Sequence, residues 1–202
     1  GVSVKENTIH PLTRLVHQHS LMYDEDLSFW QALAAQHPGA LLELGCGSGR
    51  VLSCLAGTGA QVYGLAHQRE PLALLRAGWR LSQQPRVFVA DMRAYRLEAH
   101  FTLIYVPCNT FSTLDAAQRA ATLACALRHL APGGAFVASL PNPVALRQVS
   151  RMGASEVEDV FSHPGDGAPV QVSSAWERDR QRFRLTWHFD HLLPDGSVER
   201  LS

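Results

Sequence analysis

The sequence predicts an α/β protein with a Rossmann-like, doubly wound and mainly parallel sheet, helices on both faces, and a C-terminal antiparallel β meander. Short apolar runs alternate with helical stretches from residue 40 to residue 140, a pattern typical of a parallel sheet with right-handed crossovers. A glycine-rich turn follows the first apolar run. After Pro141-Asn142-Pro143 the rhythm changes to strands joined by short turns.

These observations predict three segments. Residues 1–39 form a helical N-terminal cap, residues 40–142 form the Rossmann-like core, and residues 143–202 form a helix and an antiparallel meander that we expect to be truncated. Composition agrees with one globular domain or one domain with an appendage, because 46% of the 202 residues are hydrophobic and 18% are charged.

The N-terminal segment starts with a polar, histidine-rich stretch over residues 1–22, with Pro11 as a breaker, so a loop or a short helix is expected there. Asp24 or Asp26 can cap the next helix, which Pro38-Gly39 ends. Apolar residues repeat along that helix with helical spacing at Leu27, Trp30, Leu33 and Ala34.

The core alternates strands with helices. The expected strands are Ala40–Leu44, Gln61–Leu65, Val87–Ala90, Phe101–Val106 and Ala135–Leu140. The expected helices are Arg50–Ala56, Glu70–Leu81 and one that Asp115 caps, which ends near Leu130 before Pro132-Gly133-Gly134.

The C-terminal segment begins with a predicted helix over Val144–Arg151 and continues through a turn-rich loop over His163–Pro169. Three strands then follow, with turns near Asp179-Arg180 and at Pro194-Asp195-Gly196. Their expected ranges are Val170–Trp176, Phe183–Leu193 and Ser197–Leu201.

Charge and cysteine content exclude several classes of function. Lys and Arg total 18 and Asp and Glu total 18, so the net charge is zero and a general electrostatic grip on nucleic acid or anionic membrane is not expected. No apolar run approaches the length of a membrane span. None of the cysteines has zinc-ligand spacing, so we expect reduced thiols in a cytoplasmic protein. They are Cys46, Cys54, Cys108 and Cys125.

The glycine-rich turn carries the main functional signal. Glycines at 45, 47 and 49 allow a sharp turn and close approach of a ligand to the backbone, and the next helix presents free N–H groups. Arg50 stands where a dinucleotide fold places a third small residue, which disfavours nicotinamide or flavin binding. Without a following Gly-Lys-Ser/Thr, the turn is not a P-loop.

Several motifs in the order and spacing of one family make residues 23–142 resemble the class I S-adenosylmethionine-dependent methyltransferases, in particular small-molecule methyltransferases with an antiparallel insertion after the fifth strand. The motifs are Tyr23-Asp24, the Glu43–Arg50 loop (E-L-G-C-G-S-G-R), Ala90–Arg93, Pro107–Phe111 and Leu130–Gly134.

The resemblance implies S-adenosylmethionine as cofactor, S-adenosylhomocysteine as product and a role for each matched residue. Glu43, Gly45, Gly47 and Gly49 would hold the methionine end of the cofactor. Each matched residue, Glu43 included, can instead have a purely structural role, as a cap, in core packing, in loop packing or as an exposed aromatic.

The resemblance places further residues around the rest of the cofactor. Asp91 would hydrogen-bond the adenine amino group and Met92 would pack on adenine. Cys108 would lie beside the methyl group with Asn109, which we assign to substrate binding, and Tyr23 would cover the cofactor.

One departure from the family pattern concerns the second strand. The family places an acid at its end to accept both ribose hydroxyls, and this chain has Ala66 there, with no acidic residue between Glu43 and Glu70. Loss of those charge-assisted bonds would weaken binding by about 1.5–3 kcal/mol. His67 or Glu70 can substitute in part, or the cofactor site has decayed.

The sequence therefore predicts methyl transfer to a small-molecule N or O nucleophile, with a weak or inactive binding module as the alternative. The transfer depends mainly on positioning, so no catalytic residue is assigned. The chain ends where the family's sheet usually gains two more strands, and an exposed sheet edge can pair with a second copy as a homodimer.

Two clusters of basic residues are expected to have no binding or catalytic role. The arginines at 178, 180, 182 and 184 are expected at a solvated hairpin tip, with an anion-binding patch as the alternative. The histidines at 10, 17 and 19 lack a ligand pattern, so no metal is predicted. The loop after the fourth strand lacks the Asn/Asp-Pro-Pro-Tyr pattern of nucleic-acid amino methyltransferases, so no nucleic-acid substrate is expected.

Overall fold

The computed structural model describes residues 9–78 and 84–202, which pack into two compact units. One unit contains residues 23–140, and the other contains residues 9–22 and 141–202. The predicted helix around Leu27–Ala34 thus belongs with the parallel sheet, whereas residues 9–22 belong with the C-terminal strands. The end of the helix predicted to reach Leu81 lies outside the described residues.

The first unit contains a five-stranded parallel sheet in the order β3-β2-β1-β4-β5, which confirms the predicted Rossmann-like core. β2 and β4 flank β1, so the chain reverses its direction of travel across the sheet between β1 and β4. The strands are β1 (Ala40–Leu44), β2 (Gln61–Ala66), β3 (Arg86–Val89), β4 (Phe101–Val106) and β5 (Leu130–Ala138).

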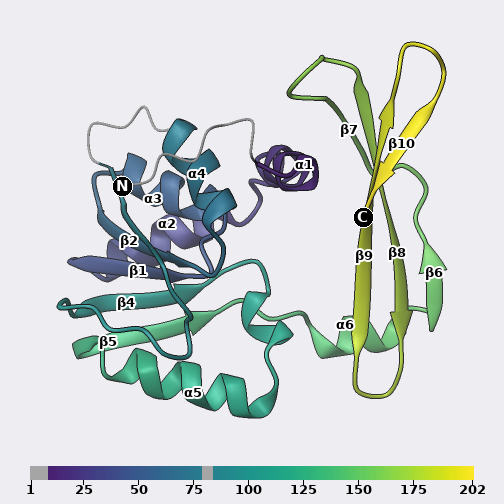
Figure 1. Cartoon of the computed structure of the whole chain (residues 1–202). Helices are drawn as coiled ribbons and strands as arrows, with labels where there is room; N and C mark the ends of the chain where they lie inside the picture. The colour runs from purple at the N-terminus through teal and green to yellow at the C-terminus, as the bar shows by residue number, and fades with distance from the viewer. Residues whose placement is uncertain (1–8, 79–83) are drawn as a thin grey trace. The chain divides into compact units, whose positions relative to one another are not determined.

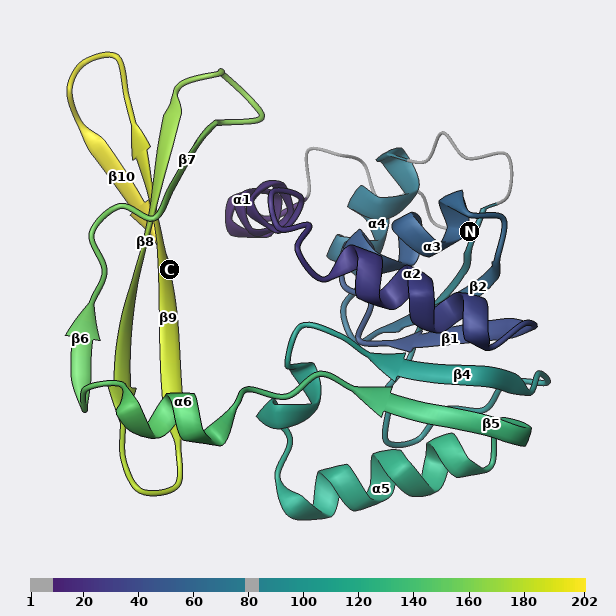
Figure 2. The same ribbon diagram turned by 180° about the vertical axis from the view of Figure 1, so that it is seen from behind.

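Helices cover both faces of this sheet (Figures 1 and 2). Alternate residues of β1 divide between two cores: Leu41 belongs to a cluster with α2, α3 and α4, and Leu42 belongs to a cluster with α5. The helices are α2 (Leu27–Gln36), α3 (Arg50–Gly57), α4 (Arg69–Gly78) and α5 (Ala116–Leu127), and a short 3₁₀ helix covers Thr110–Thr113.

Asp115 caps α5 as predicted: its side chain accepts from the Gln118 N–H at 2.8 Å, and Gln118 accepts from the Asp115 N–H at 3.0 Å. The predicted end of this helix is wrong. α5 ends at Leu127, and Pro132-Gly133-Gly134 lies inside β5, where the pairing register with β4 shifts. An outer strand tolerates proline, and glycine suits a bulge, so the motif forms part of the strand.

The prediction that the Asp26 side chain caps α2 is also wrong. Asp26 precedes α2, but its carboxylate makes no cap hydrogen bond and its backbone is helical. The carboxylate instead accepts from Trp30 Nε1 at 2.9 Å and from the Arg50 guanidinium. The Asp26 carboxylate, which the pattern assigned to a helix cap, therefore forms a partly buried ion pair with Arg50 instead.

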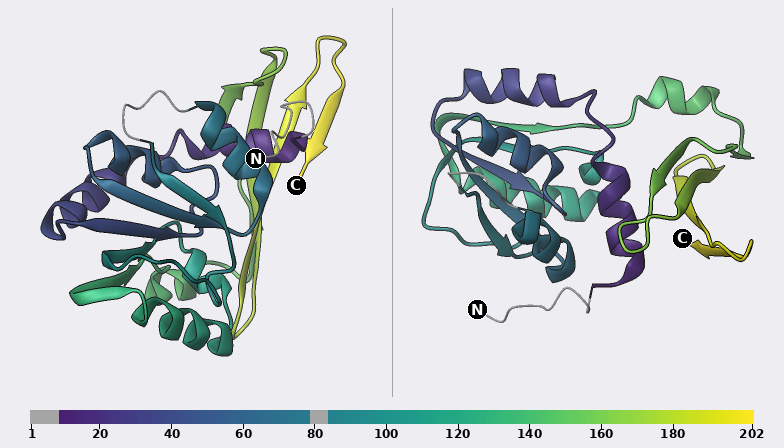
Figure 3. Two further views of the ribbon diagram at one scale, coloured as in Figure 1. Left: turned by 60° about the vertical axis from the view of Figure 1, so that its left-hand side comes forward. Right: turned by 90° about the horizontal axis from the view of Figure 1, so that it is seen from above.

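The second unit is an antiparallel sheet in the order β10-β9-β8-β6, with β7 also paired to β8. Its strands are β6 (Met152–Ala154), β7 (Asp159–Ser162), β8 (Pro169–Arg178), β9 (Phe183–Leu192) and β10 (Val198–Leu201). The helix α1 (Pro11–Ser20) packs on it, with Leu15 buried among Val170, Val172 and Phe189 (Figure 3). The C-terminal antiparallel strands are confirmed.

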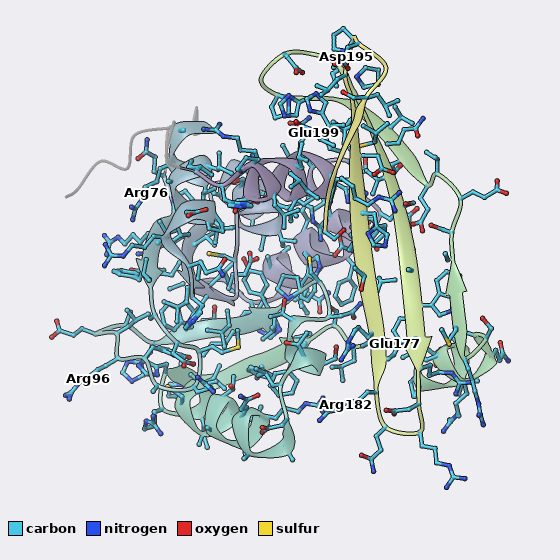
Figure 4. The ribbon with its side chains drawn as sticks, turned by 45° about the vertical axis from the view of Figure 1, so that its right-hand side comes forward. Arg76, Arg96, Glu177, Arg182, Asp195 and Glu199 are labelled. Carbon is cyan, nitrogen blue, oxygen red and sulfur yellow. The ribbon has the colours of Figure 1, made fainter. Side chains whose placement is uncertain are left out.

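Details of this unit differ from the sequence prediction. The helix α6 covers Pro143–Gln148 and is shorter than predicted, and β6 and β7 were not predicted. The β8–β9 turn lies between Arg178 and Phe183, so the arginines do gather at a hairpin tip, where Arg184 pairs with Glu177. Glu177 and Arg182 are labelled at this end in Figure 4.

Within the described ranges, none of the helices is both long and apolar enough to cross a membrane.

Candidate cofactor site

The residues predicted to bind a ligand gather at the carboxyl edge of the parallel sheet. The glycine turn follows β1, Ala66 ends β2, Asp91 follows β3, and Cys108 follows β4. Because parallel strands all end at one edge, these segments lie along the same side of the sheet. The β1–β4 reversal is the position at which open α/β sheets bind ligands, and the glycine turn and the Cys108–Asn109 loop flank it.

Hydrogen bonds from neighbouring backbone fix the glycine turn. The N–H groups of Gly45 and Cys46 both donate to the carbonyl of Leu65 at 2.8 Å, and the Gly49 N–H donates to the Cys46 carbonyl at 2.7 Å. Gly45, Gly47 and Gly49 have φ values of 78°, 51° and 83°, a region that side chains rarely adopt. The turn is therefore built independently of any ligand.

The three glycines face different surroundings. A Cβ on Gly49 would lie 2.3 Å from Leu75 Cδ1, so this glycine serves helix packing. A Cβ on Gly45 would lie 3.1 Å from Thr110 Cγ2 and 3.3 Å from Met92 Cε. A Cβ on Gly47 would meet nothing within 4 Å. Gly47 is thus the glycine of the turn with open space above its Cα.

Arg50 connects the glycine turn to two other segments, a role that the sequence does not reveal. Its guanidinium forms an ion pair with Asp26, donates to the Tyr23 carbonyl at 2.9 Å and donates to Cys108 Sγ at 3.1 Å. The Arg50 side chain is only 7% exposed. Its guanidinium also lies 4.9 Å from the centroid of the Tyr23 ring.

Arg50 therefore brings three predicted site segments together: the glycine turn, Tyr23 and Cys108. Tyr23 itself is 50% exposed. The sequence signal for Arg50 was its departure from the dinucleotide pattern, which identified an unusual residue but not its partners.

Glu43 lies in the core beneath the turn. The residue is 2% exposed, and its Oε2 atom is buried without a hydrogen-bond partner among the described residues. Burial raises the pKa of this carboxyl to about 8, although the nearby Tyr105 hydroxyl and Arg50 act to lower it. The Tyr105 hydroxyl is also buried without a partner of hydrogen-bond geometry, so the proximity of these two groups does not satisfy either.

The loop after β4 has an unusual backbone. Cys108 and Asn109 are consecutive non-glycine residues with φ values of 57°. Such conformations cost about 1–3 kcal/mol each and persist only where the surroundings hold them. Here the Asn109 N–H donates to Ser139 Oγ at 2.9 Å, and the Asn109 carbonyl accepts from the Ser112 N–H at 2.9 Å. Ser139 is a supporting residue that sequence patterns did not identify.

The β2–β3 side of the edge is built differently. Ala66 is 4% exposed and belongs to the apolar cluster with Leu72 and Leu75, and its carbonyl accepts from the Ala90 N–H at 3.0 Å. His67 is exposed. The predicted ribose position therefore presents a methyl group on a buried strand end with an exposed imidazole next to it.

Asp91 already has a partner. Both carboxylate oxygens accept from the Arg93 guanidinium, and Oδ1 also accepts from the Arg93 N–H at 2.8 Å. These interactions lower the pKa of Asp91 to about 2. Met92 is partly buried on the α5-side core. The structure thus brings Met92 to the glycine turn, whereas Asp91 is engaged by a neighbouring side chain.

The N-terminal histidines belong to the other unit. His19 Nε2 pairs with Asp159 at 2.9 Å, and burial lowers the pKa of His17. In the part of the chain that the structure describes, the only group with metal-ligand geometry is His163, Asp166 and His191.

Comparisons with known proteins agree with this geometry. A family model described as a methyltransferase domain matches residues 41–134, which contain the glycine turn, Asp91 and the loop after β4. This match and the fold of the chain are consistent with a class I S-adenosylmethionine-dependent methyltransferase. Among curated protein sequences, none matches the chain significantly.

Solved structures extend the similarity over almost the whole chain. The sugar N-methyltransferase KedS8 from a Streptoalloteichus species is 19% identical with a TM-score of 0.75, over 100% of this chain and 79% of that one. The amino pentose methyltransferase CalS10 from Micromonospora echinaspora, solved with S-adenosylmethionine bound, is 23% identical with a TM-score of 0.68, over 92% and 73%. The glycopeptide N-methyltransferase MtfA is 26% identical with a TM-score of 0.55, over 86% and 76%.

Proposed function

We propose that this protein transfers the methyl group of S-adenosylmethionine to a nitrogen of an amino-sugar-like small molecule, with an oxygen nucleophile as the less favoured acceptor. The observation that carries the proposal is the preformed glycine turn at the β1–β4 reversal, with Gly47 open above its Cα. The nitrogen acceptor rests on the similarity to sugar, amino pentose and glycopeptide methyltransferases.

The residues at this edge fit the proposed cofactor in two respects. The open space at Gly47 admits a ligand close to the backbone, as its conformation and surroundings allow. The unpartnered Oε2 of Glu43 is a buried anion-forming group beneath the same turn, which the ammonium of a methionine moiety would stabilise. When bound, S-adenosylmethionine supplies a methyl group on a sulfonium that is already electrophilic.

This chain's residues then have positioning roles. Gly45, Gly47 and Gly49 with Glu43 hold the methionine end, and Tyr23, tied to Arg50, covers it. Cys108 lies beside the methyl group, and Asn109 on the same loop orients the acceptor. Alignment of nucleophile and methyl and exclusion of water account for catalysis, so no catalytic side chain is assigned.

The adenosine end has the proposed contacts of Asp91 and Met92, with Ala66 and His67 at the ribose. Asp91 would have to share its carboxylate between Arg93 and the adenine amino group. Ala66 is the specific observation that favours the second candidate function, a catalytically weak or inactive binding module on the same fold. We further propose a cytoplasmic protein without a nucleic-acid partner, in which an outer strand of a sheet pairs with a second copy.

One experiment separates the two candidates. S-adenosylmethionine and S-adenosylhomocysteine are first titrated into the protein by calorimetry. Release of S-adenosylhomocysteine is then measured with matched acceptors, free or nucleotide-linked sugars that carry an amino or a hydroxyl group at the same carbon. Binding with turnover on the amino sugars supports the enzyme, binding without turnover on any acceptor supports the binding module, and absence of binding contradicts both.

A further inference from the structure

The antiparallel unit contains a group of side chains that the proposed methyl transfer does not use. His163 and Asp166 lie in the β7–β8 loop, and His191 lies in β9. One ligand atom from each lies within 4.8 Å of the others. All three residues belong to the same compact unit, so the arrangement is internal to that unit.

The geometry points to a site for a divalent transition-metal ion, and we propose that His163, Asp166 and His191 bind zinc or a similar ion. His163 Nδ1 lies 2.9 Å from Asp166 Oδ1, and His191 Nε2 lies 3.1 Å from Asp166 Oδ2. Adjacent ligand atoms of a tetrahedral zinc site with bonds of about 2.0–2.1 Å are separated by about 3.3 Å. A two-nitrogen, one-oxygen set with an open fourth position is common for zinc.

His163 Nδ1 is also close to two backbone N–H groups. The N–H groups of Gly165 and Asp166 both point at His163 Nδ1, at 3.3 and 3.4 Å. The same nitrogen lies 2.9 Å from Asp166 Oδ1, to which it can donate a proton. A bound zinc ion would replace that proton, because a metal-bound imidazole nitrogen uses its one lone pair for the ion.

The strand register holds the candidate ligands in place. Ser162 pairs with Pro169 at the end of the β7–β8 hairpin, the His163 N–H donates to the Ala168 carbonyl at 2.7 Å, and the Ala168 N–H donates to Asp166 Oδ1 at 3.0 Å. His191 pairs with Val170 of β8 and is 7% exposed. These contacts are all made within the chain and hold the backbone of the three residues in place.

A second carboxylate lies behind the buried histidine. Glu199 of β10 is the register partner of His191, and its Oε2 lies 3.9 Å from His191 Nδ1 (Glu199 is labelled in Figure 4). Metal-bound histidines usually direct their second ring nitrogen to a carboxylate or carbonyl, which fixes the ring and the tautomer. Glu199 is placed for that supporting role.

The sequence predicted no metal. The three candidate ligands come from the β7–β8 loop and from β9, and the pairing of β7 and β9 with β8 is what brings these two segments together. A metal ion at this site would cross-link the β7–β8 loop to β9. It is independent of S-adenosylmethionine binding, which takes place in the other unit.

Zinc titration of chelator-treated full-length protein tests the proposal, with cobalt absorbance as a second probe and magnesium as a hard-ion control. We expect one zinc per chain at micromolar or lower Kd, a four-coordinate cobalt spectrum, and no binding of magnesium. Asp166→Asn keeps the cap to Ala168 and should weaken zinc binding at least tenfold, His191→Ala should abolish it, and Glu199→Gln should weaken it about 10- to 100-fold.

His188→Ala is the matched control, because His188 is also in β9 but its Nδ1 pairs with Ser202 Oγ and not with this group. It should leave zinc affinity unchanged, and all four variants should bind S-adenosylhomocysteine as the wild type does. Absence of stoichiometric zinc binding would overturn the proposal. So would zinc binding that Asp166→Asn and His191→Ala leave intact, since the ion would then lie on other histidines.

Discussion

The two halves of the candidate cofactor edge differ in what builds them. On the β1–β4 side, backbone geometry is fixed by internal contacts: left-handed glycines, two left-handed residues after β4, and a buried arginine that joins three segments. On the β2–β3 side, charged side chains are expected to bind the adenosine end of the cofactor. Ala66 has no charge, and the Asp91 carboxylate is already paired with Arg93. The chain thus has the backbone shape that the resemblance predicts on the β1–β4 side. On the β2–β3 side it lacks part of the side-chain charge that the resemblance predicts.

The largest expected effect is on the shape-dependent side. Gly47→Val should abolish measurable binding of S-adenosylhomocysteine in calorimetry, because the new side chain would occupy the open space above the turn. The fold should persist, since a Cβ at Gly47 meets nothing within 4 Å, although the positive φ costs about 1–2 kcal/mol of stability.

Gly59→Val is the matched control for this variant. Gly59 also has a positive φ and nothing within 4 Å of its Cβ, but it lies in the turn that follows α3, away from the carboxyl edge of the sheet. It should lose similar stability in thermal melts and keep full affinity. Equal affinity of Gly47→Val and wild type would remove the cofactor from this turn.

The next effect concerns the adenine contact. Asp91→Ala should weaken S-adenosylhomocysteine binding by about 1–3 kcal/mol, the cost of a lost hydrogen bond to a buried partner. The inosine analogue lacks the amino group that Asp91 should accept from, so the substitution should affect it less. Equal losses for both ligands would mean that Asp91 serves only to hold Arg93.

Glu43 provides a pH-dependent test of the buried end of the site. Its pKa is raised from 4.5 to about 8, so the folded protein retains a proton that the unfolded chain releases. The free energy of unfolding contributed by this group therefore falls as pH rises from about 4.5 to about 8. Glu43→Gln should flatten that decline in denaturant unfolding measured across this range.

The exposed Glu156→Gln in the other unit is the control for this measurement and should leave the slope unchanged. A steeper decline in Glu43→Gln than in wild type would contradict the assigned direction of the shift. Bound S-adenosylhomocysteine should oppose the decline in wild type, because its ammonium favours the anionic form of Glu43.

The smallest expected effect is at Arg93. Arg93→Ala frees the Asp91 carboxylate for adenine, and the affinity for S-adenosylhomocysteine should rise by less than about fivefold, since an exposed ion pair contributes little. Calorimetry at low and moderate salt measures it. A loss of affinity would show that Arg93 itself contacts the ligand or orients Asp91 for it.

The sequence predicted the fold well because the parallel sheet depends on short-range signals. Buried runs such as Phe101–Val106, the glycine turn and the Asp115 cap each occur within a few residues. Pro132-Gly133-Gly134 misled because its local preference is for a helix end, whereas pairing with β4 places it in a strand. Long-range pairing overrode local preference there.

Long-range contacts also limited the prediction of the site. The edge positions follow from motif order, but the Asp26–Arg50 pair joins residues far apart in sequence, and nothing local to Asp26 distinguishes it from a helix cap. The support of Asn109 by Ser139 and the meeting of His163 with His191 likewise depend on strand pairing. Residue identity alone does not show which distant partner a side chain takes.

The most direct test of the central claim, a preformed methionine end beside a ribose position without its acid, is calorimetric titration of S-adenosylhomocysteine into wild type and Ala66→Asp. Asn at the same position serves as the uncharged control. The new carboxylate is buried at an apolar strand end, so ligand-free Ala66→Asp should melt at a lower temperature than wild type.

With ligand, the affinity of Ala66→Asp should exceed that of wild type by about 1.5–3 kcal/mol, or about 10- to 150-fold, and the 2′-deoxy ligand should gain about half as much. An unchanged affinity would mean that the site has decayed beyond Ala66. Micromolar binding by wild type that Ala66→Asp weakens would contradict the account, because another group such as His67 would then already hold the ribose.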